Sequence, residues 1–154
     1  MREQIMTYFK NLLSSFLSAY RAHYSCNNVL LKCIEDWKCA LDNNETIGCI
    51  LMDLSNAFDS IPHGLLIAKM FAYGMSLEAC EFIRCYLTNR KQRVKLDMYR
   101  SEWKNIDKGV PQGSIIGPVL FNIFVNDLLL SLQNKCTVYN YADDNTLAFH
   151  HPDH

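Results

Sequence analysis

Tyr141-Ala142-Asp143-Asp144 stands between two short runs, residues 137–141 and 146–149, that are rich in β-branched, aromatic and apolar side chains. Runs of this kind are typical of strands, and Asp-Asp-Asn is typical of a turn. The stretch therefore predicts a β-hairpin with Asp143 and Asp144 at its tip.

Two adjacent carboxylates repel each other unless water surrounds them or a cation lies between them. One interpretation is a solvated turn, because hairpin tips commonly carry Asp. The other is a Mg²⁺ site, since Mg²⁺ is bound by one or two carboxylates together with substrate phosphates. The second interpretation needs a further carboxylate from elsewhere in the chain.

Asp53 is the candidate for that carboxylate. It follows an almost continuous apolar run in residues 47–54, which predicts a strand buried on both faces. A carboxylate there is costly to bury unless it is paired or binds a metal. Asp59 precedes Pro62 and is interpreted as a cap or local hydrogen-bonding residue instead of a metal ligand, and His63 as a structural residue.

The spacing of apolar side chains predicts the helices. They are expected over residues 5–17, from a cap at Asn28 to residue 42, from Pro62 to a stop at Gly74, over residues 77–87, and after the entry Gly117-Pro118. The first two are expected to contribute to the core. Helices and strands interleaved before a final hairpin indicate an α+β domain.

Residues 108–114 form a loop rich in glycine and proline, in which Gly113 lets a ligand approach the backbone closely. Before it lies the one concentrated basic stretch. Its cationic residues are Arg90, Lys91, Arg93 and Lys95, on a strand that returns through Trp103. Two interpretations remain open: a solvated edge strand protected by its charges, or a surface that follows a phosphate backbone.

The chain has 154 residues, 49% of them hydrophobic, with a net charge of −1 and a pI near 6.5. This is the composition of one globular domain, and any nucleic-acid binding must come from a local patch. The seven cysteines lack C-x-x-C spacing, which favours free buried thiols over zinc ligands. No secretory signal or membrane span is recognised, so we expect an intracellular protein of the nucleus or cytoplasm.

Three motifs in this order resemble the core of reverse transcriptases, and those of non-LTR (LINE-type) retrotransposons in particular. They are residues 51–59 around Asp53, residues 109–114 (Gly-Val-Pro-Gln-Gly-Ser) and residues 141–144 (Tyr-Ala-Asp-Asp). The likeness extends over residues 17–149. It implies an α+β polymerase palm, an antiparallel sheet with packed helices, at residues 46–154. Residues 1–45 would be a helical fingers-side segment, and no thumb is expected.

The resemblance also implies roles for individual residues. Asp53, Asp143 and Asp144 would be the catalytic carboxylates that bind two Mg²⁺ ions, for which Mn²⁺ can substitute. The nucleotide would be contacted by Phe58, which blocks a 2′-hydroxyl, by Gln112 and Gly113, and by Arg21. Primer and template would be contacted by Tyr141, Arg90, Lys91, Arg93 and Lys95.

The function implied is RNA-directed DNA synthesis: transfer of a nucleotide from a dNTP to a DNA primer on an RNA template. Because no thumb is recognised, this chain alone is expected to be weak or inactive. One alternative is a catalytically silent retroelement remnant that at most binds nucleic acid or a partner. Another is a palm-like nucleotidyl cyclase, for which Phe58 and the Pro111-Gln112-Gly113 loop would not be expected.

Overall fold

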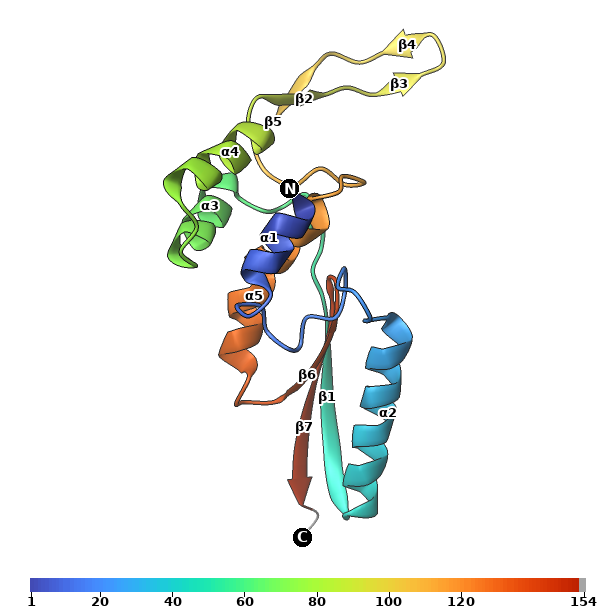
Figure 1. The fold of residues 1–154 in the computed structure, drawn as a ribbon. Coiled ribbons are helices and arrows are strands. Elements are labelled where there is room, and N and C mark those ends of the chain that lie inside the picture. The colour runs from blue at the N-terminus through green and yellow to red at the C-terminus, as the bar shows by residue number, and fades with distance from the viewer. Residues whose placement is uncertain (153–154) are drawn as a thin grey trace. The chain divides into compact units, whose positions relative to one another are not determined.

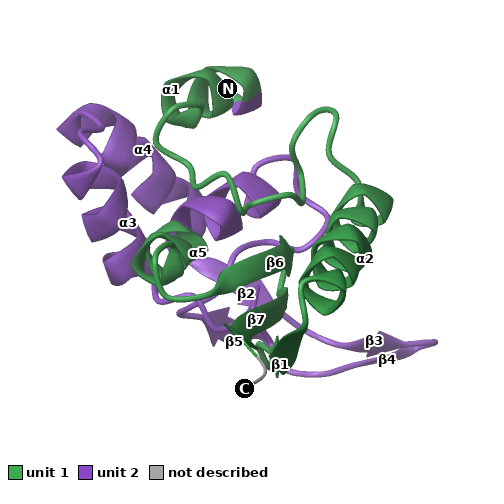
Figure 2. Ribbon diagram, turned by 90° about the horizontal axis from the view of Figure 1, so that it is seen from below, with its two compact units in different colours: residues 1, 3–55, 125–154 green, residues 2, 56–124 purple. Residues whose placement is uncertain are grey.

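The computed structural model describes residues 1–152, in which helices and strands are interleaved (Figure 1). In chain order the elements are α1 (Arg2–Phe9), α2 (Cys26–Asp42), β1 (Glu45–Asp53), α3 (His63–Ala72), α4 (Leu77–Leu87), β2 (Arg90–Gln92), β3 (Lys95–Leu96), β4 (Tyr99–Arg100), β5 (Lys104–Ile106), α5 (Gly117–Leu132), β6 (Thr137–Tyr141) and β7 (Asp144–Pro152). They belong to two compact units, one of residues 3–55 and 125–152 and one of residues 56–124 (Figure 2).

The first unit is built on a three-stranded sheet in the order β1-β7-β6, with both pairs antiparallel. One face of β6 and β7 buries Val138 and Leu147. The other face carries Tyr139, whose hydroxyl reaches Asp36 on α2 at 3.0 Å. The mixed α/β architecture with antiparallel sheets confirms the predicted fold class at this level. The predicted hairpin is confirmed as β6 and β7, but its turn is Ala142-Asp143, and Asp144 lies in β7 instead of at the tip, because it pairs with Tyr141.

β1 forms where the sequence predicts a strand, but the prediction that it is buried on both faces is wrong. It is an edge strand, and most of its residues are exposed. Ile50 is 53% exposed and Leu51 is 78% exposed. An apolar run specifies a strand equally well at the edge or the centre of a sheet, because the strand order depends on distant partners.

The N-cap of α2 lies three residues before the predicted cap. Ser25 is the N-cap, and its hydroxyl accepts a hydrogen bond from the Asn28 backbone N–H at 3.2 Å. The expectation that its apolar stripe lies in the core is also wrong, because Ala40 is its one buried residue. Leu31 and Leu41 are exposed.

α1 is much shorter than the predicted helix over residues 5–17, since the helix ends at Phe9. The chain then passes through turns that Asn126 of α5 fixes. The Asn126 side-chain amide donates to the Leu12 carbonyl at 2.9 Å, and its oxygen accepts from the Ser14 backbone N–H at 2.6 Å. Tertiary hydrogen bonds from Asn126 supplement the short-range backbone bonds of these turns, such as that from the Leu13 N–H to the Phe9 carbonyl at 3.0 Å, although the apolar spacing continues.

In the second unit α4 matches its predicted bounds. Ser76 caps it by accepting from the Ala79 backbone N–H. α3 follows Pro62 and ends before Gly74, whose φ is 89°. α3 packs against α4, and Lys69 of α3 donates to the Phe124 carbonyl of α5 at 2.7 Å. The buried side chains of this unit include Leu66, Met70, Ile83, Leu87, Val119 and Leu120.

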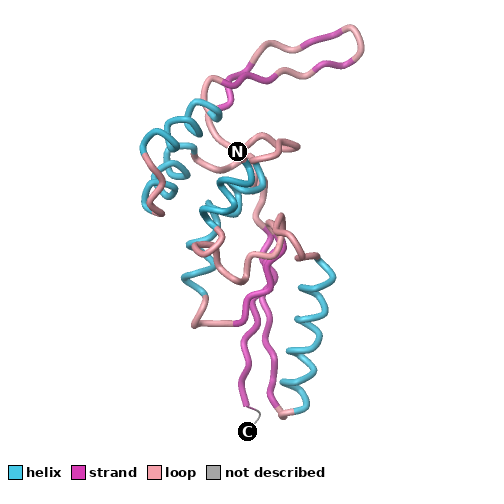
Figure 3. Tube along the Cα trace, viewed as in Figure 1, coloured by secondary structure: helices cyan, strands magenta, loops and turns pink. Residues whose placement is uncertain are grey.

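A two-stranded antiparallel arm leaves α4, with β2 paired to β5 near its root and β3 paired to β4 near its tip (Figure 3). The prediction that a basic segment is followed by a returning strand is confirmed, but the basic strand is divided into β2 and β3, and Trp103 lies just before β5 and not in a strand.

All seven cysteines are free, but only Cys80 is buried, so the expectation of buried thiols is wrong for the others. Within residues 1–152 no helix combines the length and apolar character needed to cross a membrane.

Candidate active site

Asp53 and Asp144 lie opposite each other at one end of the three-stranded sheet. Asp53 is the last residue of β1, Asp144 is the first of β7, and the two are cross-strand partners. Such partners project from the same face with Cβ atoms about 4.5–5.5 Å apart. Tyr141, the last residue of β6, is the partner of Asp144 on its other side. The pairing therefore sets Asp53, Asp144 and Tyr141 in one row across the sheet.

The turn between β6 and β7 consists of Ala142 and Asp143. Ala142 has a φ of 57°, a left-handed conformation that costs a non-glycine residue about 1–2 kcal/mol. Two buried asparagines stabilise it. Asn140 Nδ2 donates to the Ala142 carbonyl at 2.8 Å and to Asn145 Oδ1 at 2.9 Å. Asn145 Nδ2 donates to the Asp143 carbonyl at 2.9 Å.

These asparagines are functional candidates that the sequence reasoning missed. They are cross-strand partners placed symmetrically about the turn, and both are almost completely buried. The sequence does contain a signal for them: one asparagine lies on each side of Asp143 and Asp144, within runs that predict strands. Their role is to fix the backbone that carries Asp143.

Tyr20 is a second neighbour that sequence reasoning missed. Burial, then the negative charge of Asp143, then Tyr141, raise the pKa of its phenol above the ordinary value. Its backbone has a φ of 62°. The phenol of Tyr20 therefore lies within electrostatic range of Asp143, and nothing in the local pattern of residues 18–25 indicates this.

A partly buried hydrogen bond joins α2 to the same sheet. The Tyr139 hydroxyl donates to Asp36 at 3.0 Å, and Lys32 forms an ion pair with Asp36 at 2.8 Å. Burial by itself would raise the pKa of Asp36, but the hydrogen bonds from Lys32 and Tyr139 lower it below its ordinary value. Burial and the bond to Asp36 raise the pKa of Tyr139.

The donor set suits a hard divalent cation in part. Asp53 and Asp144 supply the one or two carboxylates by which Mg²⁺ is commonly held beside substrate phosphates. Within residues 1–152, however, no three His, Cys, Asp or Glu side chains lie close enough together to hold a metal ion. Asp53, Asp143 and Asp144 thus do not form a closed cluster.

In the second unit, two of the sequence motifs pack against each other. The Val110 backbone N–H donates to the Phe58 carbonyl at 2.8 Å, and the Gly109 N–H donates to the Ile61 carbonyl at 2.8 Å. The Phe58 ring stacks on Phe121, with centroids 4.4 Å apart and an interplanar angle of 14°. The ring of Phe58 is therefore held from one side by α5.

Gly109 is required by this packing. Its φ is 83°, and a Cβ there would lie 2.7 Å from the Asp59 backbone. Its carbonyl accepts hydrogen bonds from Arg90 and, at 2.8 Å, lies against His63 Nε2. His63 is buried, as its structural interpretation predicts. Sequence reasoning singled out Gly113 and missed Gly109.

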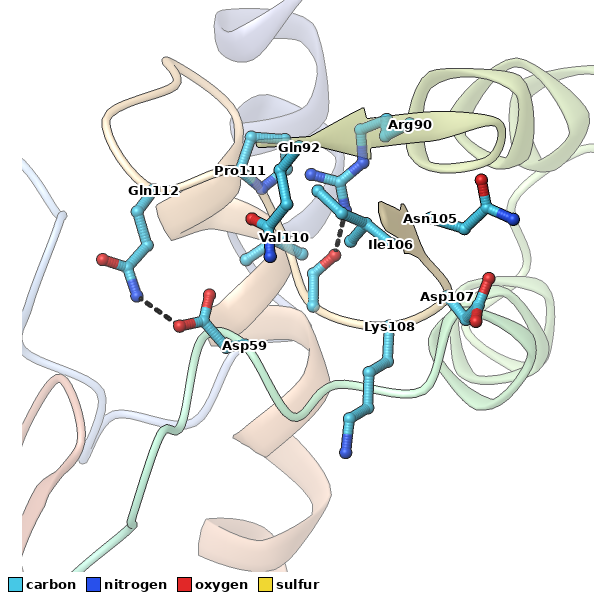
Figure 4. A pocket seen from close by; sticks show the side chains of 11 residues that line it. Asp59, Arg90, Gln92, Asn105, Ile106, Asp107, Lys108, Val110, Pro111 and Gln112 are labelled. Atoms are coloured by element: carbon cyan, nitrogen blue, oxygen red, sulfur yellow. Dashed lines mark hydrogen bonds between the residues drawn. The ribbon is translucent and has the colours of Figure 1, made fainter. Parts of the chain in front are cut away.

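Gln112 and Asp59 meet at the edge of a cavity of about 700 Å³ (Figure 4). Gln112 Nε2 donates to Asp59 Oδ2 at 3.2 Å. Asp59 is therefore a hydrogen-bonding residue, but the prediction of a cap or a local partner before Pro62 is wrong, because its partner lies in another sequence motif. Lys108 and Asp107 also line the cavity. A Cβ at Gly113 would meet nothing within 4 Å, so that backbone is open to a ligand.

A profile of the family described as Reverse transcriptase (RNA-dependent DNA polymerase) matches residues 1–154. The chain belongs to the reverse transcriptase family.

The relatives of this reverse transcriptase chain include enzymes of mobile elements. It is 35% identical to the RNA-directed DNA polymerase from mobile element jockey of Drosophila funebris, over 68% of this chain and 12% of the relative. It is 29% identical to the probable RNA-directed DNA polymerase from transposon X-element of Drosophila melanogaster, over 81% of this chain and 14% of the relative. It is 30% identical to the probable RNA-directed DNA polymerase from transposon BS of Drosophila melanogaster, over 71% of this chain and 13% of the relative.

The predicted likeness to non-LTR retrotransposon enzymes is confirmed. The chain spans 12% to 14% of the lengths of these curated relatives.

Arg21 and Arg90 are predicted to contact the nucleotide and the primer–template, respectively. In the structure of this reverse transcriptase chain both form hydrogen bonds to backbone carbonyls of the chain itself. Arg21 donates to the carbonyls of Ser14 and Leu17, each at 3.0 Å, and lies 4.8 Å from the ring of Tyr24. Arg90 donates to the carbonyls of Leu87 and Gly109 and is half-buried. Lys91, Arg93 and Lys95 are exposed along the arm.

Proposed function

We propose that this chain is the palm-centred part of an RNA-directed DNA polymerase. Residues 46–154 would form the palm and residues 1–45 the fingers-side segment. The observation that carries the proposal is the pairing of Asp53 with Asp144 at the open end of the sheet, with Asp143 in the adjoining turn. Membership of the reverse transcriptase family supports it.

The residues proposed to hold the metal are Asp53, Asp143 and Asp144, with Mg²⁺ as the ion and Mn²⁺ as its substitute. When bound, a pair of divalent ions stabilises the attacking 3′-oxygen of the primer and the departing pyrophosphate of the dNTP. Asp53 and Asp144 supply the oxygen ligands from two neighbouring strands. Asn140 and Asn145 keep the turn, and with it Asp143, in a fixed conformation.

The proposed substrates are an RNA template, a DNA primer and dNTPs. Phe58, fixed by its stack on Phe121, would meet the sugar and exclude a 2′-hydroxyl. Gln112, Gly113 and Arg21 would contact the nucleotide, and Tyr141 the primer end. Lys91, Arg93 and Lys95 would contact the nucleic-acid backbone, with Arg90 fixing the root of the strand. The site of action would be the nucleus or the cytoplasm.

Metal binding tests the proposal directly. A ligand that binds only the native state stabilises it, by about 1.4 kcal/mol at a concentration tenfold above Kd. Millimolar Mn²⁺ should therefore raise the Tm of the wild-type chain. Asp53→Asn and Asp144→Asn should each abolish the shift. Asp42→Asn, which removes an exposed carboxylate at the end of α2, is the matched control and should keep it.

A second candidate function is a catalytically silent domain that retains nucleic-acid binding. It is favoured by the finding that, in the described part of the chain, no three side chains gather as metal ligands. This candidate predicts an unchanged Tm in Mn²⁺ together with binding of primer-template. A Tm shift that disappears in both Asp→Asn variants but persists in Asp42→Asn would exclude it.

A further inference from the structure

The arm formed by β2, β3, β4 and β5 exposes nearly its whole length. Every residue from 91 to 105 is exposed, and only Arg90 and Ile106 at the root are half-buried. At about 3.3 Å per residue, six residues of one strand span about 20 Å. The arm extends from the end of α4 (Figures 1 and 3). An isolated two-stranded ribbon is only marginally stable. The arm therefore needs side-chain contacts between its strands and anchoring at its root.

Specific contacts stiffen the arm at its root and at mid-length. Arg90 is bonded to the Leu87 and Gly109 carbonyls at the root. Farther out, the guanidinium of Arg93 lies over the Trp103 ring, 4.4 Å from its centroid. The Val94 backbone N–H donates to the Ser101 hydroxyl, and the Ser101 N–H donates to the Val94 carbonyl, both at 2.9 Å. These contacts hold the ribbon in one conformation before any partner arrives, which lowers the entropic cost of binding.

The charge of the arm is opposite to that of the chain as a whole. The chain carries a net charge of −1. The arm carries cations on both strands against two anions: Lys91, Arg93, Lys95, Arg100 and Lys104 against Asp97 and Glu102. Lys95 and Arg100 are cross-strand partners, so their like charges lie side by side unless an anion lies between or near them. A polyanion would relieve this repulsion along the ribbon.

The tip of the arm is apolar. Leu96 is 70% exposed, Met98 is 94% exposed and Tyr99 is 81% exposed. Leu96 and Tyr99 pair across the hairpin, and Asp97 has a φ of 50° at the turn. Apolar side chains such as Leu and Met, presented between basic flanks, are the kind that wedge between base steps in the minor groove of DNA.

We propose that this arm binds B-form duplex DNA, with Lys91, Lys95, Arg100 and Lys104 on the phosphates and Met98 and Leu96 wedged against a base step. The proposal rests on the proposed function in treating Lys91 and Lys95 as contacts to a nucleic-acid backbone, but it assigns the apolar tip to duplex DNA and not to the hybrid of primer and template. An A-form RNA–DNA hybrid fits the arm less well, because its minor groove is wide and shallow. A protein partner is disfavoured, since apolar interface cores are depleted of charged residues.

Binding in EDTA tests the arm apart from the metal site. Fluorescence anisotropy would follow a labelled DNA duplex between about 50 and 200 mM salt. The Lys95→Gln, Arg100→Gln double variant should reduce the slope of log K against log salt by about 1.8, or about 0.9 for each phosphate that it no longer neutralises. Lys38→Gln with Lys135→Gln removes two exposed charges from the other unit and should leave the slope unchanged.

The wedge has its own readout. The fluorescence of a 2-aminopurine placed in the duplex should increase when the wild-type chain binds, because base stacking quenches this fluorescence and the wedge unstacks the base. The Leu96→Ser, Met98→Ser double variant should abolish this signal and lower the affinity about tenfold, while keeping the salt slope. Far-UV circular dichroism and urea unfolding would show that both double variants fold as the wild type does.

The proposal would be overturned by an unchanged salt slope in the charge variant, by an unchanged 2-aminopurine signal in the tip variant, or by equal tip dependence on an RNA–DNA hybrid. Tip variants that alter only self-association in sedimentation would assign the tip to a second copy of the chain, and so would also overturn it. DNA binding is measured in EDTA, which removes divalent ions, so it does not depend on the metal site. Intact DNA binding without a Tm shift in Mn²⁺ would therefore contradict only the proposed function. A Tm shift in Mn²⁺ without DNA binding by the arm would contradict only the proposal for the arm.

Discussion

At the scale of single residues, side-chain amides fix the backbone where the predicted catalytic groups lie. Asn145 and its partner Asn140 hold the strained turn at Ala142. Gln112 is held by Asp59, which belongs to a different sequence motif. In both cases the hydrogen bonds of an amide restrict a loop that would otherwise be free to move.

Asn145→Ala should destabilise the chain, because it removes one buried and one partly buried hydrogen bond and leaves the amide of Asn140 with one fewer acceptor. The expected decrease is about 1–3 kcal/mol in the free energy of unfolding, measured by urea denaturation. Asn134→Ala, at an exposed position before β6, should change it by less than about 0.5 kcal/mol. Equal stability of the two variants would show that the turn needs no support.

Asp59→Ala should free the side chain of Gln112 with little effect on stability, since the pair is exposed. We expect a change below about 0.5 kcal/mol in unfolding free energy but weaker binding of a dNTP, measured by equilibrium titration. Asp107→Ala removes another carboxylate from the wall of the same cavity and serves as the control. An equally large decrease of affinity in the control would assign the effect to cavity charge and not to Gln112.

At the scale of elements, α2 is joined to the sheet by a polar contact more than by its apolar stripe. Most of that stripe is exposed, whereas Tyr139 of β6 donates to Asp36. The pKa of Asp36 is lowered in the folded chain from an ordinary value of 3.8. Its carboxylate therefore stabilises the fold above about pH 4, and this contribution disappears as the pH falls through the lowered folded pKa.

Tyr139→Phe should lower the free energy of unfolding by about 1 kcal/mol at neutral pH. The difference from the wild type should shrink as the pH is lowered from 5 toward 2, because protonation of Asp36 removes the charged acceptor in both proteins. Urea unfolding at several pH values measures this. Tyr99→Phe, on the exposed arm, should match the wild type throughout. A difference that does not vary with pH would mean that packing, not the bond to Asp36, explains the destabilisation.

At the scale of the whole molecule, a small net charge accompanies many exposed apolar side chains. Leu31, Leu41, Ile50 and Leu51 are all exposed on α2 and β1, and one edge of β1 pairs with no other strand of the described chain. Unpaired strand edges and apolar patches favour association, and a net charge near zero does not oppose it.

Self-association should therefore be strongest near the pI of about 6.5, and Ile50→Lys should reduce it by placing a charge on the edge strand. Sedimentation velocity over a range of concentrations measures the effect. Phe82→Lys makes a similar change at an exposed position of α4 and should reduce association less. An equal reduction by both variants would trace the effect to net charge and not to the edge of β1.

Elements whose signals are local can be predicted from the sequence. The bounds of α4, the β6–β7 hairpin and the returning basic strand follow from periodicity, caps and turn residues within a few positions. The order of three motifs was also enough to predict the family. Such features depend on neighbours along the chain, so a linear reading captures them.

Contacts between groups that are far apart in the sequence become visible only in the folded chain. Nothing beside Asp59 in the sequence indicates that it binds Gln112, and nothing beside Asn126 indicates that it ends the helical path after Phe9. The exposure of β1 was mispredicted for the same reason. Strand order and long-range hydrogen bonds depend on residues far apart in sequence, because a strand or a polar side chain is compatible with many partners until packing selects one.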